Sequence, residues 1–76
     1  MNSSKNENLT IRGVISEALP STLFRVRFNG EGEEEKEILA YLSGKMRMHR
    51  IKVLIGDTVE VLLDPYGGKG RIIKRL

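Results

Sequence analysis

The stretch Thr22-Leu23-Phe24-Arg25-Val26-Arg27-Phe28 has the most regular alternation of apolar and polar side chains in the sequence. Successive side chains of a β-strand point to opposite faces, so the two phenylalanines and Val26 share one face. Because a face with two aromatic rings belongs in a core, Arg25 and Arg27 are predicted on the outer face. The stretch therefore predicts a half-buried strand that carries two outward arginines.

Similar patterns precede and follow this strand. Residues 9–17 alternate around Gly13, and a glycine within a strand marks a bulge or a bend. A turn is predicted at residues 19–21, because proline cannot donate a hydrogen bond to a neighbouring strand. Residues 37–42 predict a third strand, whose outer face carries Tyr41 on the same side as the two arginines.

The remaining chain predicts a short helix and two further strands. Ser43 can cap a helix over residues 44–50 by accepting a hydrogen bond from a following backbone amide. Residues 58–64 and 71–76 predict the last two strands, with a glycine-rich loop between them. The fifth strand contains two adjacent isoleucines that cannot both point inward, so its facing stays open.

Five short strands, a bent first strand and one short helix between strands three and four describe an all-β, five-stranded OB-fold barrel. The position of the helix favours this fold over an SH3-like barrel. Closure of the barrel also removes the exposed strand edges that lead to aggregation. We expect residues 9–76 to form this domain. Residues 1–8 are polar and have nothing to bury, so they predict a disordered N-terminal arm.

The composition excludes several kinds of site. The chain has no cysteine and a single histidine, His49, which excludes thiolate-ligated metals and a histidine-rich metal cage. No local spacing matches a P-loop, a dinucleotide fingerprint or a catalytic triad. We therefore expect no enzyme activity, no catalytic residue, no metal and no cofactor. Apolar runs fall short of the roughly 20 residues of a membrane span, so no membrane partner is expected.

Positive charge is concentrated in the second half of the chain. The net charge of +3 divides into −2 for residues 1–44 and +5 for residues 45–76. No acidic residue lies between Glu37 and Asp57. Like charges on a short helix repel one another, so their clustering favours a surface that binds polyanions over an ordinary solvated face. The basic residues of the predicted helix are Lys45, Arg47 and Arg50.

A second basic group is expected around the glycine-rich loop. In an OB barrel the loop between strands four and five borders the face of strands two and three, so their side chains are expected to converge. Arginines bind phosphates bidentately and aromatic rings stack on unpaired bases. A face rich in arginine and poor in aromatics suits structured RNA. The residues expected to converge are Arg25, Arg27, Tyr41, Tyr66, Lys69 and Arg71.

The placement of three apolar or aromatic residues stays open at this level. Met46 and Met48 lie between the basic residues of the predicted helix. At least one of them is expected in the core, while either could serve as an adaptable apolar contact at an interface. Tyr66 follows a proline and is expected to be exposed, with packing at a corner of the loop as the alternative.

Several strings carry a resemblance to one family. These strings are Gly13-Val14-Ile15 with Glu17, Leu19-Pro20 with Phe24-Arg25-Val26, Leu42-Ser43-Gly44-Lys45-Met46-Arg47, Ile55-Gly56-Asp57-Thr58-Val59-Glu60-Val61, and Pro65-Tyr66 through Lys69-Gly70-Arg71-Ile72. They resemble bacterial-type translation initiation factor 1, and the similarity runs from Leu9 to Arg75. The Ser-Gly-Lys-Met-Arg string is rather specific to that family. The stretch over residues 30–37 is longer and more acidic than is usual there.

The resemblance implies a non-enzymatic factor that binds the small ribosomal subunit at its A site. Such a factor would contact ribosomal RNA, block premature tRNA entry and assist the other initiation factors. We expect it to be a monomer in the cytoplasm, with the plastid stroma as the alternative. The residues to which the resemblance assigns RNA contacts are Arg25, Lys45, Met46, Arg47, Tyr66, Lys69 and Arg71.

Two other functions stay open from the residues. A cold-shock-like chaperone would bind unstructured single-stranded RNA tightly without ribosomes, but few aromatic residues are available for stacking. A protein-interaction barrel would use the acidic run Glu33-Glu34-Glu35 and the sheet face, and it would have negligible affinity for polyanions. The clustering of basic residues in the predicted helix argues against the second alternative.

Overall fold

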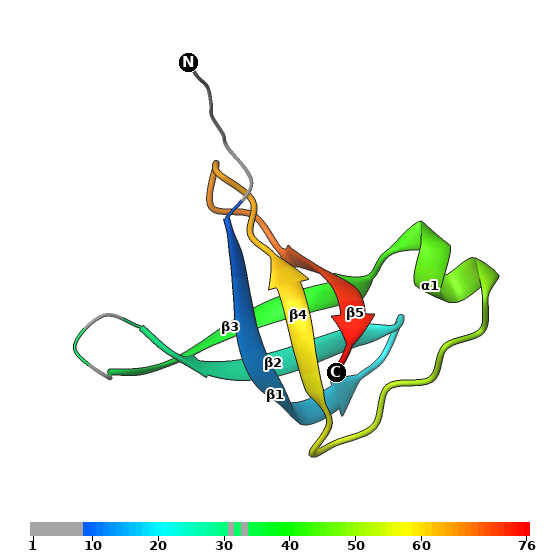
Figure 1. The fold of residues 1–76 in the computed structure, drawn as a ribbon, viewed down its shortest axis with the longest axis horizontal. Coiled ribbons are helices and arrows are strands. Elements are labelled where there is room, and N and C mark those ends of the chain that lie inside the picture. Colours follow the sequence, from blue (N-terminus) through cyan, green and yellow to red (C-terminus); the bar gives the residue numbers. More distant parts are fainter. Residues whose placement is uncertain (1–8, 31, 33) are drawn as a thin grey trace.

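The barrel predicted from the strand pattern is confirmed. The structure, a computed structural model, describes residues 9–30, 32 and 34–76, so the predicted arm over residues 1–8 lies outside its described part. The elements are β1 (Thr10–Leu19), β2 (Leu23–Asn29), β3 (Glu35–Leu42), α1 (Gly44–Met48), β4 (Thr58–Leu62) and β5 (Gly70–Arg75). The strands form a closed barrel in the order β1-β2-β3-β5-β4 (Figure 1). The helix and the fourth strand are shorter than predicted, because the chain turns away after each of them.

β1 belongs to both sides of the barrel and bends at Gly13. Its first half pairs with β4 and its second half with β2. A β-carbon at Gly13 would lie 2.5 Å from a γ-carbon of Val26 and 2.8 Å from the carbonyl oxygen of Arg27. The missing side chain therefore lets β2 cross close to the bend, as the glycine within the predicted strand indicated.

The core fills the barrel with small and branched aliphatic side chains. Its buried members are Ile15, Val26, Ala40, Met46, Val53, Val59, Val61 and Ile72. The facing of β5, which the sequence leaves open, is decided here: Ile72 is fully buried, whereas Ile73 is 37% exposed. β5 closes the barrel by pairing in parallel with the end of β3 and antiparallel with β4.

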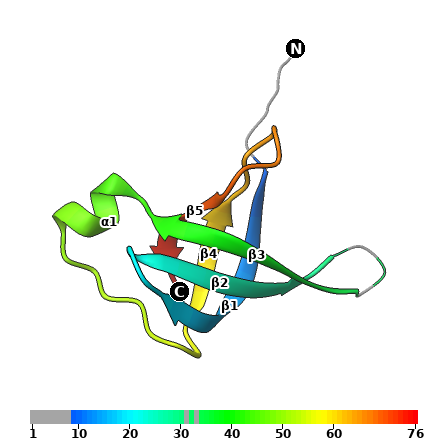
Figure 2. The ribbon, with the colours of Figure 1, turned by 180° about the vertical axis from the view of Figure 1, so that it is seen from behind.

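α1 lies over one end of the barrel and is held there by its cap and by one side chain. The Ser43 hydroxyl oxygen accepts a hydrogen bond from the Met46 amide at 3.1 Å, so the predicted cap is confirmed. Met46 points into the core and is 2% exposed. The β2–β3 hairpin extends on the side of the barrel away from α1 (Figures 1 and 2). Within the described residues, no helix has the length and apolar character needed to cross a membrane.

Replacement of Ser43 by alanine is expected to lower the free energy of unfolding by about 1 kcal/mol. The physical reason is that the amide of Met46 loses its acceptor at a site where water has little access, since Ser43 is 8% exposed. Urea unfolding of both proteins measures this difference. Ser43→Thr keeps a hydroxyl at the cap and is expected to recover most of the loss; equal losses in the two variants would contradict the capping role.

Candidate nucleic-acid interface

The outer face of β2 and β3 carries the side chains predicted for it. In the antiparallel register Tyr41 lies beside Leu23, and Arg27 lies beside Glu37. Val26 and Ala40 point to the opposite, buried face. The outward placement of Arg25, Arg27 and Tyr41 is therefore confirmed, although their contact with RNA stays a prediction.

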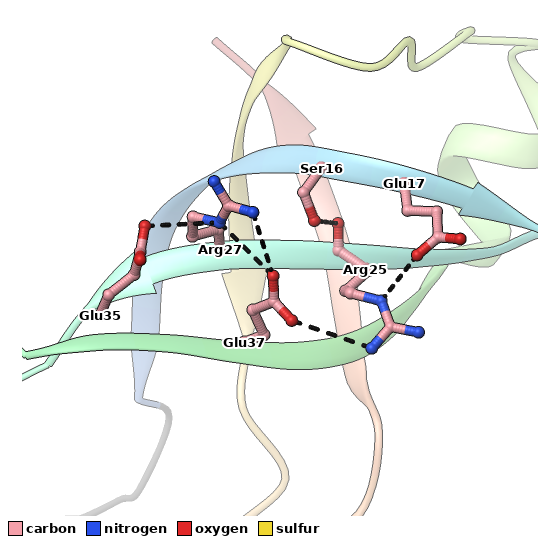
Figure 3. Close-up of polar contacts among 6 residues, drawn as sticks. All are labelled: Ser16, Glu17, Arg25, Arg27, Glu35 and Glu37. Carbon is pink, nitrogen blue, oxygen red and sulfur yellow. Dashed lines mark hydrogen bonds and ion pairs between the residues drawn. The ribbon is translucent and has the colours of Figure 1, made fainter.

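Glutamates bind both outward arginines of β2. Arg25 Nε lies 3.0 Å from Glu17 Oε1, and Arg25 Nη1 lies 3.8 Å from Glu37 Oε1. Arg27 Nε lies 3.4 Å from Glu35 Oε2, and Arg27 Nη2 lies 3.3 Å from Glu37 Oε2. Figure 3 shows that these carboxylates come from the strands on either side of β2. The arginines are thus paired within the protein, a contact that sequence spacing does not indicate.

Tyr41 meets the second basic group where β3 and β5 lie side by side. It is paired in register with Arg71, whose guanidinium carbon lies 5.9 Å from the centre of the tyrosine ring, a cation–π distance. A pocket of about 290 Å³, here called the seam pocket, opens beside them. Its lining includes Tyr41, Leu62, Asp64, Lys69 and Arg71. The predicted convergence is confirmed for Tyr41, Lys69 and Arg71 only. Arg25 and Arg27, predicted to join them, do not line this pocket and bind glutamates instead.

The loop between β4 and β5 presents Tyr66 to solvent. The Asp64 carboxylate accepts hydrogen bonds from the Tyr66 amide at 2.9 Å and from the Gly68 amide at 3.0 Å. These bonds fold the loop, and a β-carbon at Gly68 would collide with the same carboxylate. Tyr66 is 94% exposed. Its predicted exposure is confirmed, and packing at the corner is excluded.

The cations predicted for the helix are exposed, with Arg50 two residues beyond the end of α1, but Met46 is not exposed. Lys45, Arg47 and Arg50 all lie on the surface. The resemblance placed Met46 among the RNA contacts. Its side chain packs in the hydrophobic core and is 2% exposed, so burial removes it from the surface. Met48 is the methionine left outside, with 77% of its surface exposed.

Two grooves flank α1 and collect further basic residues. One groove, of about 460 Å³, is lined by Lys45 and His49 together with Lys74 and Arg75 of β5. The other, of about 480 Å³, has an apolar floor and is lined by Arg47, Arg50 and Lys52.

Lys52, Lys74 and Arg75 were not in the set of contact residues predicted from the sequence. A bulge in the β4–β5 pairing shifts the register before Lys74, so alternation could not assign its face. The high density of basic residues over residues 69–75 is the sequence feature that indicates a role for Lys74 and Arg75.

The two basic groups lie on the same side of the barrel. Figures 1 and 2 show α1 and the β4–β5 loop at the two flanks of the upper side, with the β3–β5 seam between them. The Ser43 amide donates a hydrogen bond to the Ile72 carbonyl at 3.0 Å, which ties the start of α1 to β5. We call this side, from Tyr66 across the seam pocket to Lys45 and Arg47 of α1, the basic end.

Among the described residues, no carboxylate forms an ion pair with a cation of the basic end, although Asp64 lines the seam pocket. Over residues 9–30, 32 and 34–76, ion pairs involve only the arginines of β2. The described part of the chain also contains no group of three or more histidine or acidic side chains that could hold a metal ion. Exposed, uncompensated cations beside an exposed aromatic ring are suited to bind phosphates and unpaired bases.

Comparisons with known proteins agree with this geometry. The family model described as "Translation initiation factor 1A / IF-1" matches residues 1–76. The solution structure of translation initiation factor 1 from the Wolbachia endosymbiont strain TRS of Brugia malayi is similar, with 38% identity and a TM-score of 0.73. That match covers 91% of this chain and 78% of the other. The crystal structure of YjeQ from Thermotoga maritima is 31% identical with a TM-score of 0.69, over 90% of this chain but only 23% of that one.

Proposed function

The chain belongs to the family of translation initiation factors 1A and 1, and on that premise we propose that it binds the small ribosomal subunit at the A site. There it contacts ribosomal RNA, blocks premature tRNA entry and assists the other initiation factors. The family consists of non-enzymatic translation factors, and we propose that this member likewise has no catalytic activity. It acts as a monomer in the cytoplasm, or in the stroma if the chain comes from a plastid.

The observation that supports this proposal most is the uncompensated positive charge of the basic end. Phosphate contacts supply most of the affinity of proteins for nucleic acids, and ion pairs within the protein would weaken them. The cations of α1 and the seam pocket lie on one side of a closed barrel, so one RNA surface can meet both groups. Residues 9–76 are thus the proposed RNA-binding domain.

Each predicted contact residue has a proposed role. The cations of α1 and of the seam pocket bind phosphates, and Tyr66 stacks on an unpaired base. Met46 does not contact RNA through its side chain in this proposal. Its insertion into the core holds α1 and thereby fixes the direction of the neighbouring cations. The proposed phosphate-binding residues are Lys45, Arg47, Arg50, Lys69 and Arg71. For Arg25 and Arg27 an RNA contact stays a prediction, because a phosphate would have to compete with glutamates for them.

Chemical footprinting on small subunits tests the proposal. Addition of the protein is expected to protect RNA bases of the A site, and a tRNA anticodon stem should then be excluded from that site. Protection at another site, or no protection at saturating protein, would contradict the proposed function. A variant that lacks the positive charges of α1 provides the matched control, and its expected loss of affinity is derived in the Discussion.

A further inference from the structure

Five charged residues on the outer face of β1, β2 and β3 form one connected network (Figure 3). Strand register creates it: Glu17 of β1 is paired with Arg25, and Glu37 of β3 is paired with Arg27. Glu37 also reaches Arg25 diagonally, so its two carboxylate oxygens bind different arginines. A hydrogen bond from the Ser16 hydroxyl to the Arg25 carbonyl, 3.1 Å long, ties the backbones of β1 and β2 beneath the network.

The network itself carries a net charge that repels RNA. Two arginines stand against three glutamates, so the network has a net charge of −1 at a place where an oligonucleotide would need cations. The side chains are 38–63% exposed, and ion pairs with that much contact with water contribute little to stability. Their arrangement is therefore better explained by an effect on ligand binding than by a contribution to the stability of the fold.

The same face lacks a stacking surface. Proteins that bind single strands without sequence preference place several aromatic side chains along a basic groove, and in OB folds this is commonly the face of strands two and three. The register places Tyr41 on this face, with leucines at the neighbouring outward positions. The Tyr41 ring already has the Arg71 guanidinium over it.

We propose that Glu17, Glu35 and Glu37 determine the RNA specificity of this protein. By binding Arg25 and Arg27, they close the outer face of β1, β2 and β3 to unstructured single strands, and RNA is left to bind at the basic end. The proposal rests on the proposed function in one respect, namely that RNA is the ligand. It adds that an acidic network on the strand face that adjoins the basic end selects against flexible RNA.

The test uses oligouridylate of about 12 nucleotides, a length within the roughly 4–16 nucleotides that one OB fold covers. Glu35→Gln/Glu37→Gln removes both carboxylates that bind Arg27 while it preserves the size of the side chains. One added phosphate contact steepens the slope of log affinity against log salt concentration by roughly 0.7 for a single strand. The contribution of that contact to the binding constant then changes about fivefold for each tenfold change in salt. At about 0.1 M salt we therefore expect about fivefold tighter binding and that steeper slope.

Two control variants distinguish the effect of freeing Arg27 from its glutamates from the effect of a change in net charge. Glu34→Gln/Glu60→Gln changes the net charge equally but leaves the carboxylates of the network in place, so its affinity is expected to change by less than about twofold. Arg27→Gln added to the test variant is expected to abolish the gain. In the wild-type protein Arg27→Gln is expected to change the affinity for oligouridylate little, because Arg27 is already bound by Glu35 and Glu37.

The proposal is overturned if the test variant binds no more tightly, if the charge control gains as much, or if the gain survives Arg27→Gln. Should the double variant lose its cooperative thermal unfolding, Glu37→Gln, which loosens both arginines, takes its place in the same comparison. No ribosome enters these titrations. Failure of the A-site footprint with a gain in the test variant would contradict the proposed function alone, whereas a normal footprint without the gain would contradict only the network's role.

Discussion

Replacement of Lys45 and Arg47 by glutamine is expected to weaken binding to the small ribosomal subunit about thirtyfold at about 0.1 M salt. Each lost phosphate contact reduces the log–log salt slope by roughly 0.7–0.9, so two contacts correspond to a factor of about 25–60 for each tenfold change in salt. Both residues are exposed on α1, and among the described residues neither takes part in an ion pair. Neither side chain therefore has to give up an ion pair within the protein in order to bind a phosphate.

Titration of labelled protein with small subunits over a salt series measures both quantities. The matched control is Arg12→Gln/Lys36→Gln, which removes the same charge from exposed positions of β1 and β3 outside the basic end. This control is expected to leave the slope nearly unchanged. Equal losses in the two double variants would show that net charge, and not the position of α1, governs the affinity. An unchanged slope in the first variant would mean that its side chains do not touch phosphates.

Replacement of Gly13 by alanine is expected to destabilise the fold by about 3 kcal/mol, at the upper end of typical overpacking costs. The added methyl group would lie 2.8 Å from the Arg27 carbonyl oxygen, and a backbone atom in a paired strand cannot rotate away. A domain of this size has only about 4–11 kcal/mol of stability. The substitution therefore removes a large part of it, and urea unfolding followed by circular dichroism measures the loss.

Two other glycines provide graded controls for this prediction. At Gly70 the new methyl group would meet the ends of the Val61 and Ile38 side chains, which can shift, so a smaller loss is expected. At Gly44 nothing lies within 4 Å of the added carbon, and alanine favours helix, so no loss is expected. If Gly13→Ala were as stable as Gly44→Ala, the close approach of β2 at the bend of β1 would be contradicted.

Much of the fold could be predicted because alternation along a strand reports which face is buried. The outward placement of Arg25 and Arg27, the cap at Ser43 and the bend at Gly13 all depend on residues that are neighbours in the chain. The fifth strand was harder, because a bulge shifts its register and adjacent isoleucines give no alternating pattern. The burial of Met46 could not be decided either, since it depends on the rotation of a five-residue helix against the barrel.

The candidate site, like the fold, has features that the sequence indicates and features that only the folded chain decides. Composition located the positive charge in the second half of the chain, but it could not tell which cations stay uncompensated. Arg25 and Arg47 look alike in the sequence, yet the first is bound by Glu17 and the second has no such partner among the described residues. Pairing across strands depends on register, and register depends on turns and bulges that the whole barrel must satisfy.

The amino-acid sequence by itself determined the class of this protein: alternation set the five strands, glycine and serine marked the bend and the cap, and the basic clusters indicated a polyanionic ligand. Those properties are local, because they follow from each residue and its neighbours. Only the tertiary structure decided where the positive charge can act. Closure of the barrel brought α1 and β5 together at the basic end and placed three glutamates around the arginines of β2, since side chains distant in the chain interact only after the strands have paired.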